Sequence, residues 1–252
     1  MTGLTLLLQR ADLRDAFKPF TIEGPHGALF DAERDTLDLS ECHGFEMEAL
    51  MRREAAVAPA LAYIFDRLEE RFDGRPTLML IDEAWVFFDH ALFAARLRDW
   101  LKTLRKKNVS VVFATQSLSD IATSRIAPAI IESCPSRIFL ANDRAHEAGI
   151  RPAYEGFGLN QRQIDIIATA SPKRHYYYQS AVGNRLFELG LGPVALALCG
   201  ASSPADQALI DRIAGDGTEP FAGRFLAAKG FPWASDIIAR RFNEGAFKCA
   251  AE

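Results

Sequence analysis

The chain has 252 residues, a formal net charge of -4 and 49% hydrophobic residues, which is the composition of an ordinary globular protein. The small negative charge points to no particular partner. The four cysteines stand at no C-x-x-C or zinc-type spacing, so a zinc site or a disulfide framework is excluded and a reducing cytosol fits. The apolar runs at residues 4–8 and 186–199 are too short for a signal core and for a bilayer span, respectively.

The first half of the chain predicts a βαβ unit preceded by helices. We expect a helix over residues 4–17, two short strands over 28–31 and 36–39, and a long helix over 46–72. Apolar strands at 78–81 and 109–114 then flank an amphipathic helix at 90–107, which Asp89 can cap. Unbroken apolar strands are typical of a parallel sheet buried on both faces, and the crossover between them should be right-handed.

The second half predicts shorter elements with clear start signals. A helical stretch at 121–133 is broken by Pro128, and a strand covers 137–140. Asn160 with Gln163 begins a helix to 169, and two strands at 175–179 and 185–189 read as a hairpin. Ser203-Pro204 begins a helix to about 214, and two more helices follow near 221–228 and 233–242. We therefore expect an α/β domain over 1–200 and a helical appendage over 201–252.

Polar side chains follow the two apolar strands where each strand ends. Asp82 and Glu83 come directly after the first strand, and Gln116 follows the second. Parallel strands end at the same edge of a sheet, which is where open α/β sheets bind ligands. An acid that holds Mg²⁺ and a second acid that activates water are what nucleotide hydrolysis needs, as in a Walker B motif. The alternative is a strand that ends in a solvated Asp-Glu pair.

Several ordered motifs resemble one family. The stretch LMLIDEAW with its following helix, the stretch VSVVFATQS, and the later GLNQRQIDIIATASPKRHYYYQS and LGPVALALCGASS are similar to the ATPases of type IV secretion and conjugal transfer systems, of the TrbE type. The resemblance covers nearly the whole chain. It implies a RecA-like P-loop NTPase core with a mainly parallel sheet flanked by helices, and it implies ATP and Mg²⁺ as ligands.

The chain departs from this family at one important motif. No G-x-x-x-x-G-K-[ST] phosphate loop occurs in the 252 residues, whereas the family carries that loop well upstream in a longer chain. Without the loop, the main phosphate cradle and its Lys are missing. We therefore expect a partial motor domain, from a truncated reading frame or a split gene, that holds the hydrolysis edge of the site and is inactive alone.

The resemblance also implies roles for individual residues. Asp82 would bind Mg²⁺, in part through water, Glu83 would be the base that activates water, and Gln116 would sense the γ-phosphate or position that water. An arginine finger that acts in a neighbouring subunit would be Arg137, Arg174 or Arg105, and the sequence does not choose among them.

Two further groups of residues have a bland and a functional interpretation. The basic residues of the helix after Asp82 suit a solvated face, or else a contact with a neighbouring subunit or with nucleic acid (Arg96, Arg98, Lys102, Arg105, Lys106 and Lys107). His175 and the three tyrosines after it suit ordinary hairpin packing, or else base stacking. His43 has no second ligand at metal spacing.

The family resemblance predicts a motor subunit that powers pilus assembly and the transfer of DNA or protein. Its partners would be further copies or complete ATPase subunits and other channel components, with nucleic acid as a possible partner. It would be cytoplasmic and peripheral at the cytoplasmic face of the bacterial inner membrane. The alternatives are a non-catalytic module that docks on a complete secretion ATPase, and a piece of a related DNA-translocating motor.

Overall fold

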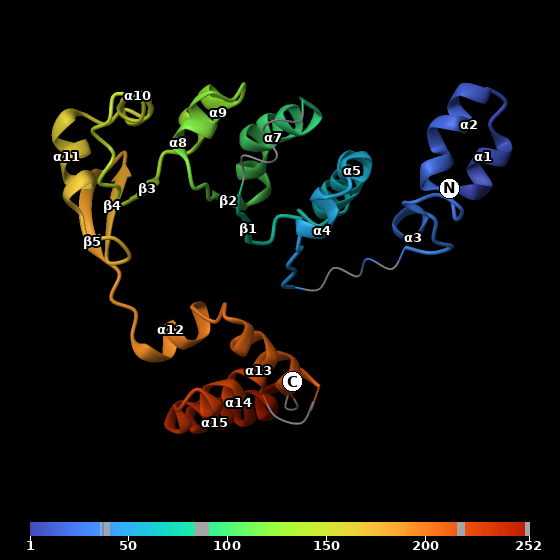
Figure 1. Ribbon diagram of the computed structural model, residues 1–252. Coiled ribbons are helices and arrows are strands. Elements are labelled where there is room, and N and C mark those ends of the chain that lie inside the picture. The colour runs from blue at the N-terminus through green and yellow to red at the C-terminus, as the bar shows by residue number, and fades with distance from the viewer. Residues whose placement is uncertain (36, 38–40, 84–90, 216–219, 250–252) are drawn as a thin grey trace. The chain divides into compact units, whose positions relative to one another are not determined.

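The chain forms two compact units. The computed structural model describes residues 1–35, 37, 41–83, 91–215 and 220–249, with the side chains of 91–93 and 242–249 left aside. The first unit is Met1–Cys134 and the second is Pro135–Glu252, and each is described by itself (Figure 1). The domain boundary predicted at residue 200 falls inside the second unit, and that division stays a prediction.

The N-terminal segment is helical, but it is not one helix. It forms α1 (Thr2–Leu7), α2 (Ala11–Phe17), η1 (Lys18–Phe20) and α3 (Gly27–Phe30). The single helix predicted over 4–17 is wrong, because the backbone is extended at Leu8 and Arg10. The strand predicted over 28–31 is also wrong, since α3 occupies that stretch. Most of its expected partner strand, at 36–39, lies outside the described residues.

Asp31 fastens this N-terminal segment. Its carboxylate accepts backbone hydrogen bonds from Thr2 at 2.9 Å and from Ile22 at 2.7 Å, and it also binds the N-terminal ammonium group and the Thr2 hydroxyl. These donors favour the charged carboxylate, so they hold the pKa of Asp31 well below its usual range. The result is that residues far apart in the segment share one anchor.

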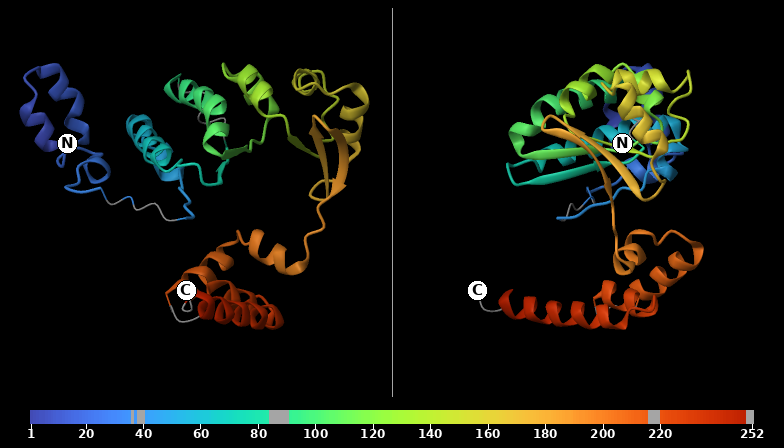
Figure 2. Two further views of the ribbon diagram at one scale, coloured as in Figure 1. Left: turned by 180° about the vertical axis from the view of Figure 1, so that it is seen from behind. Right: turned by 90° about the vertical axis from the view of Figure 1, so that its left-hand side faces the viewer.

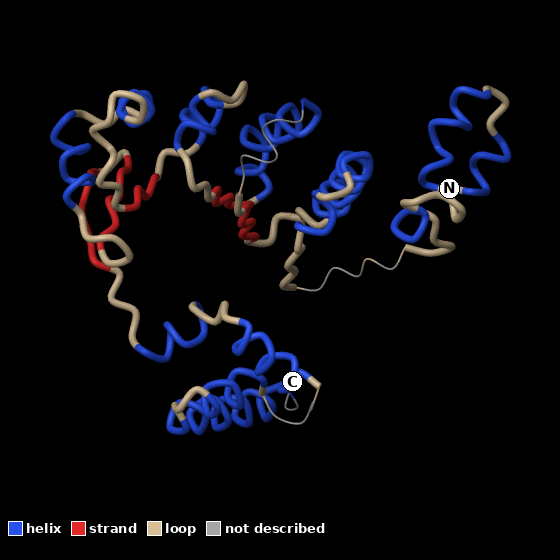
Figure 3. Tube along the Cα trace, viewed as in Figure 1, coloured by secondary structure: helices blue, strands red, loops and turns tan. Residues whose placement is uncertain are grey.

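The predicted βαβ unit is confirmed. After α4 (Glu48–Met51) and α5 (Glu54–Glu70), β1 (Thr77–Ile81) leads to α7 (Ala91–Thr103), η2 (Leu104–Lys107) and β2 (Val109–Phe113). The two strands run parallel and side by side, with Thr77 opposite Val109 and Ile81 opposite Phe113 (Figures 1 and 3). The cap predicted at Asp89 lies outside the described residues. The long helix predicted over 46–72 is interrupted at Arg53, whose φ of -115° and ψ of 69° are not helical.

The core of this unit is built around Trp100 on α7. The Trp100 side chain is 2% exposed, and its ring packs against Phe65 at 4.8 Å and Phe72 at 5.8 Å between centroids. Leu97 and Leu104 are buried beside it in sequence, at 1% and 2% exposure. These residues recur three or four positions apart, which is the spacing of one helix face.

The parallel sheet of this unit is buried on one face rather than two. Ile81 and Val109 are buried, whereas Leu78 is 64% exposed and Leu80 is 69% exposed. The expectation of strands buried on both faces is therefore wrong for the described part of the chain. Successive side chains of a strand point to opposite faces, and no described element covers the second face. The unit ends with α8 (Leu118–Ala122) and α9 (Ala127–Ser133), where Pro128 lies in the first turn of α9.

The second unit begins with a three-stranded antiparallel sheet. Its strands are β3 (Arg137–Leu140), β4 (His175–Ser180) and β5 (Gly183–Glu188), in the order β3-β4-β5, and the hairpin of β4 and β5 is seen in Figure 2. Between β3 and β4 lie α10 (Arg151–Gly156) and α11 (Gln161–Thr169). The predicted hairpin and the Asn160–Gln163 capping box are both confirmed.

The second unit ends in helices α12 (Pro193–Cys199), α13 (Pro204–Ala214), α14 (Phe221–Ala228) and α15 (Pro232–Cys249). Ser203 caps α13 in a capping box with Asp206, as its sequence indicates. Lys229, which follows α14, binds the Asp206 carboxylate at 2.5 Å. The last helix runs further than the predicted 233–242. None of the helices in the described ranges is long and apolar enough to cross a membrane.

Candidate active site

Glu83 and Gln116 meet at the carboxyl edge of the parallel sheet. The ladder continues one step beyond the strands, because the backbone N–H of Ala114 donates to the Ile81 carbonyl at 2.9 Å. The chain then turns, and the Gln116 amide donates a hydrogen bond from Nε2 to Oε1 of Glu83. The predicted convergence of the acid and the amide is therefore observed, although they lie 33 residues apart. Their chemical roles stay predictions.

The backbone at Glu83 adopts a conformation that non-glycine residues rarely use. Its φ is +50°, in the left-handed region, which costs about 1–3 kcal/mol for an ordinary residue. The Glu83 backbone N–H donates to Oδ1 of Asp82 at 3.0 Å. The tight turn thus lets Asp82 hold the backbone while the Glu83 side chain reaches Gln116. Strained turns of this kind concentrate at functional sites, where the surrounding structure maintains them.

Asp82 suits a Mg²⁺ ion that takes most of its ligands from elsewhere. Its carboxylate is exposed at the strand end, and a carboxylate oxygen is a ligand that Mg²⁺ prefers. Among the described residues, no group of three or more His, Cys, Asp or Glu side chains lies together. This part of the chain therefore offers no complete all-protein cage, which agrees with the way Mg²⁺ keeps waters and phosphate oxygens.

The three candidate arginine fingers have different surroundings. Arg137 donates from Nη1 to the Phe157 carbonyl at 3.0 Å and to the Gln179 side chain at 3.3 Å, within the second unit. Arg174 forms a two-pronged ion pair with Glu188, at 2.8 and 3.2 Å, which raises the pKa of Arg174. Arg105 lies exposed on η2, and the structure gives it no ion pair within the described residues.

Part of the basic helix serves the fold. Arg96 binds Glu69 at 2.6 Å and Asp66 at 3.5 Å, both on α5, and Lys107 lies 3.6 Å from Glu69. These pairs join α5 to α7 and η2. Two of the six basic side chains are thus engaged with acids, which weakens the case for a continuous nucleic-acid contact.

The three tyrosines of β4 divide between two faces. Tyr177 is 4% exposed and lies in the core with Phe139, whereas Tyr176 and Tyr178 are half-buried on the other face. Tyr176 stacks on Phe187 of β5, with centroids 5.6 Å apart. Packing within the hairpin thus accounts for Tyr177 and for the ring contact of Tyr176.

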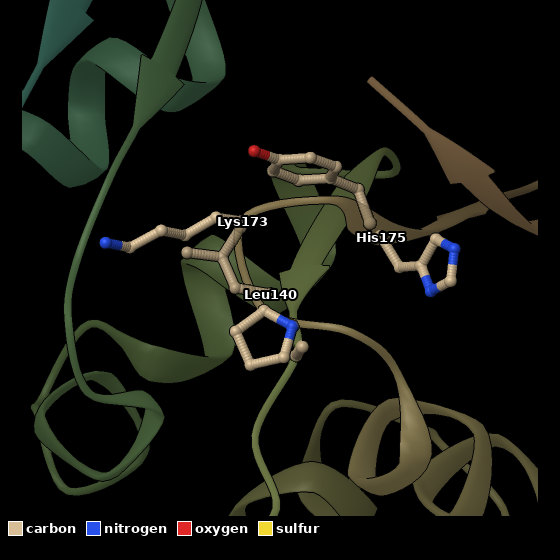
Figure 4. Close-up of a pocket in the computed structure, with 6 residues that line it drawn as sticks. Leu140, Lys173 and His175 are labelled. Carbon is tan, nitrogen blue, oxygen red and sulfur yellow. The ribbon is translucent and has the colours of Figure 1, made fainter. Parts of the chain in front are cut away.

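A cavity of about 300 Å³ opens where β3 ends and β4 begins. Its wall combines apolar groups with one ammonium group, and Figure 4 shows the side chains of Lys173 and His175 pointing in different directions beside Leu140. Lys173 has a φ of +62°, and the Ser171 backbone donates to Nδ1 of His175 at 3.2 Å. Sequence reasoning did not identify this cavity. The Pro172 just before Lys173 is a turn signal, but it does not predict which strand end the turn approaches.

Comparison with known proteins identifies the family. The model of the TraG P-loop domain matches residues 17–180. The chain is 43% identical to a probable conjugal transfer protein TrbE of Sinorhizobium fredii over 92% of its own length and 35% of the relative's. It is 48% identical to the conjugal transfer protein TrbE of Rhizobium radiobacter over 79% of its own length and 24% of the relative's. It is 34% identical to the type IV secretion system protein virB4 of Bartonella quintana over 66% of its length and 21% of the relative's.

The chain therefore belongs to the TraG P-loop domain family, a family of P-loop ATPases. The resemblance to TrbE-type proteins is confirmed, and the α/β P-loop class of the fold is confirmed with it. The chain spans about a third and about a quarter of the length of the two TrbE relatives. The solved structure of VirB4 of Thermoanaerobacter pseudethanolicus matches 56% of this chain and 38% of its own, with a TM-score of 0.46 and 18% identity. A likeness at that TM-score carries no argument about function.

Proposed function

We propose that this chain carries the hydrolysis edge of an ATPase motor that powers conjugal transfer. The observation that supports the proposal is the contact between Glu83 and Gln116 at the carboxyl ends of adjacent parallel strands. Open α/β sheets bind ligands at that edge, and phosphoryl transfer needs a water-activating group there. The family model and the TrbE relatives support the same class of activity.

Each of the three residues has its own task in this proposal. Glu83 accepts a proton from the attacking water, and Gln116 fixes the direction of the Glu83 carboxylate. Asp82 holds Mg²⁺, which supplies charge neutralisation at the phosphates when it is bound. The positive φ of Glu83 supports this division, since it separates the Glu83 side chain from the neighbouring carboxylate.

The surroundings of the arginines favour Arg105 as the finger. Arg137 is held by a carbonyl and a side-chain amide of its own unit, so its guanidinium serves the fold. Arg174 would have to leave Glu188 before it reached a phosphate. Arg105 is exposed and reaches solvent from η2. We propose that Arg105 acts on nucleotide bound to a neighbouring subunit of an oligomer.

The remaining proposals concern the setting in which the motor acts. The TrbE and virB4 relatives support a complex with complete ATPase subunits and other type IV secretion components, at the cytoplasmic face of the inner membrane. ATP with Mg²⁺ is the proposed substrate complex. A DNA-translocating role has weaker support, because Arg96 and Lys107 are engaged with Glu69.

The test uses a complete subunit that bears this sequence together with an upstream phosphate loop. Glu83→Gln should leave nucleotide binding nearly intact and reduce turnover by about 10²–10⁴-fold, because only the base for water is lost. Asp82→Asn should weaken Mg²⁺-dependent nucleotide binding, since a neutral amide is a poorer ligand for a hard cation. Nucleotide binding and turnover are measured in parallel on both variants. Normal turnover in both would overturn the proposed function.

The finger needs a separate measurement. Wild-type subunits are mixed with subunits that carry both Glu83→Gln and Arg105→Ala. If Arg105 acts in a neighbouring site, turnover per wild-type site should fall as the doubly substituted subunits are added. Doubly substituted subunits with Arg174→Ala in place of Arg105→Ala are the matched control. A fall with Arg174→Ala and none with Arg105→Ala would assign the finger to Arg174.

A further inference from the structure

One face of the parallel sheet carries exposed apolar side chains. Leu80 on β1 lies directly opposite Val112 on β2, and Leu78 lies opposite Ser110, so Leu78, Leu80 and Val112 share one face. Their exposed fractions are 64%, 69% and 49%. We call these three residues the open sheet face. They form a compact apolar patch on regular strands.

A face of this kind is unusual for a parallel sheet. Parallel strands occur almost only in sheets with both faces covered, and a two-stranded sheet is marginal by itself. Within the described strands, β1 pairs only with β2, so each strand also has an unpaired edge. An apolar face bordered by unpaired edges is a surface on which another segment can extend the sheet and cover it.

We propose that the open sheet face docks a strand–phosphate-loop–helix segment supplied by a separate polypeptide. This inference rests on the proposed function. Asp82, Glu83 and Gln116 occupy one edge of the sheet, yet the 252 residues contain no G-x-x-x-x-G-K-[ST] loop to hold a phosphate. In the two TrbE relatives, this chain spans 35% and 24% of the length, so the relatives contain much more polypeptide than the matched region.

The geometry of a phosphate-loop unit fits this surface. Such a unit is a strand, a glycine-rich loop and a helix in succession. Its strand can pair in parallel with an unpaired edge of the β1–β2 sheet, and its helix can then cover the open sheet face. Because parallel strands end at the same edge, the loop would arrive beside Glu83 and Gln116. One docking event would thus bury the apolar face and place a phosphate cradle at the acids.

This surface selects against two other occupants. A complete ATPase subunit has its own strands in the corresponding places, so it offers no free strand for the edge. A second copy of this chain could bury the patch, but it would bring no phosphate loop. The partner of the proposal is therefore a phosphate-loop polypeptide, and self-association is an outcome of the test.

The experiment mixes the 252-residue chain with one defined probe. The probe is the region of the Rhizobium radiobacter TrbE relative upstream of the matched region, cut to include its expected phosphate loop and labelled with a fluorophore. Binding is measured by fluorescence anisotropy, and amide hydrogen exchange reports which strands become protected. We expect saturable binding and slower exchange in β1 and β2.

Matched variants test whether the open sheet face is the contact. Leu80→Asp should weaken binding at least about tenfold, since it places a charge where an apolar side chain would be buried. Val182→Asp is the control, because Val182 is 97% exposed in the turn between β4 and β5. It should leave binding unchanged. Circular dichroism checks that both variants fold, and Val112→Thr replaces Leu80→Asp if that variant does not.

Three results would overturn the proposal. They are no binding of the probe, binding that Leu80→Asp leaves unchanged, and self-association through the open sheet face without binding of the probe. ATP turnover is measured separately on the mixture. A complex that forms but hydrolyses nothing leaves the docking site in place and counts against the catalytic roles. Turnover in a complete subunit without docking in the mixture does the reverse.

Discussion

Gln116 donates its side-chain amide to the carboxylate of Glu83, and the two residues follow neighbouring parallel strands. The contact matters because an amide that holds a general base decides where that base points. It also means that Gln116 is engaged with the acid, rather than directed at a phosphate, in this arrangement. Gln116 is therefore better described as a positioning residue for Glu83.

This relationship predicts the behaviour of Gln116 variants in a complete subunit. Gln116→Ala should lower turnover and leave nucleotide binding nearly intact, because the base remains but its direction is lost. Gln116→Glu should be worse, since it places a second negative charge against the Glu83 carboxylate. Steady-state turnover and equilibrium nucleotide binding are the measurements. Loss of nucleotide binding in Gln116→Ala would show that Gln116 acts on the nucleotide itself.

The 252-residue chain alone should show no appreciable ATP hydrolysis. General-base assistance contributes about 10²–10⁴-fold, but only for a phosphate that is already held in place. The chain lacks the loop that would hold it. The measurement is phosphate release by the purified protein, with Glu83→Gln as the control for a contaminating ATPase. Release that disappears in Glu83→Gln would contradict the prediction.

Trp100 should dominate the stability of the first unit. Its side chain is 2% exposed between Phe65 and Phe72, so Trp100→Ala should cost about 3–5 kcal/mol through lost contacts and a residual cavity. Trp100→Phe should cost less, because it keeps a ring and removes an indole N–H that has no hydrogen-bond partner among the described residues. Urea unfolding followed by circular dichroism measures both.

A suitable control for the Trp100 variants is Trp233→Ala. Trp233 is 58% exposed on α15, so its removal should change the unfolding free energy little. Equal losses in Trp100→Ala and Trp233→Ala would show that burial of Trp100 is not what stabilises the unit.

The pair of Asp206 and Lys229 should make the C-terminal helices sensitive to acid. The Lys229 ammonium, with help from Ser203, lowers the pKa of Asp206 from 3.8 to about 2. A lowered folded-state pKa contributes stability that is present above about pH 4 and is lost as pH falls towards 2. Lys229→Met should flatten this dependence. Urea unfolding between pH 5 and pH 2, followed by Trp233 fluorescence, is the measurement, and an unchanged slope in Lys229→Met would contradict it.

The capping box at α11 should stabilise the second unit locally. Asn160 accepts from the Gln163 backbone at 3.0 Å, and the Gln163 side chain accepts from the Asn160 backbone at 2.7 Å. Asn160→Ala should cost about 1 kcal/mol, because two helix N–H groups lose their organised partners. Gln161→Ala, on the exposed first turn, is the matched control for urea unfolding. A loss in the control as large as that in Asn160→Ala would argue against the cap.

Local signals in the sequence determined the parts of this protein whose hydrogen bonds close within a few residues. The Asn160 and Ser203 caps and the β4–β5 hairpin were predictable for this reason, and so was the βαβ unit with Glu83 and Gln116 at one edge. The family followed from ordered motifs rather than from any one residue.

Only the tertiary structure decided which side chains are covered. It turned Tyr177 into the core and Tyr176 away from it, held Arg137 against the Phe157 carbonyl, and left Leu78 and Leu80 exposed on strands with a pattern typical of full burial. Burial depends on which segments pack against a face, and an apolar run looks the same whether or not a partner is present. The break at Leu8 and Arg10 has the same origin, because the anchor at Asp31 that shapes that segment is distant in sequence.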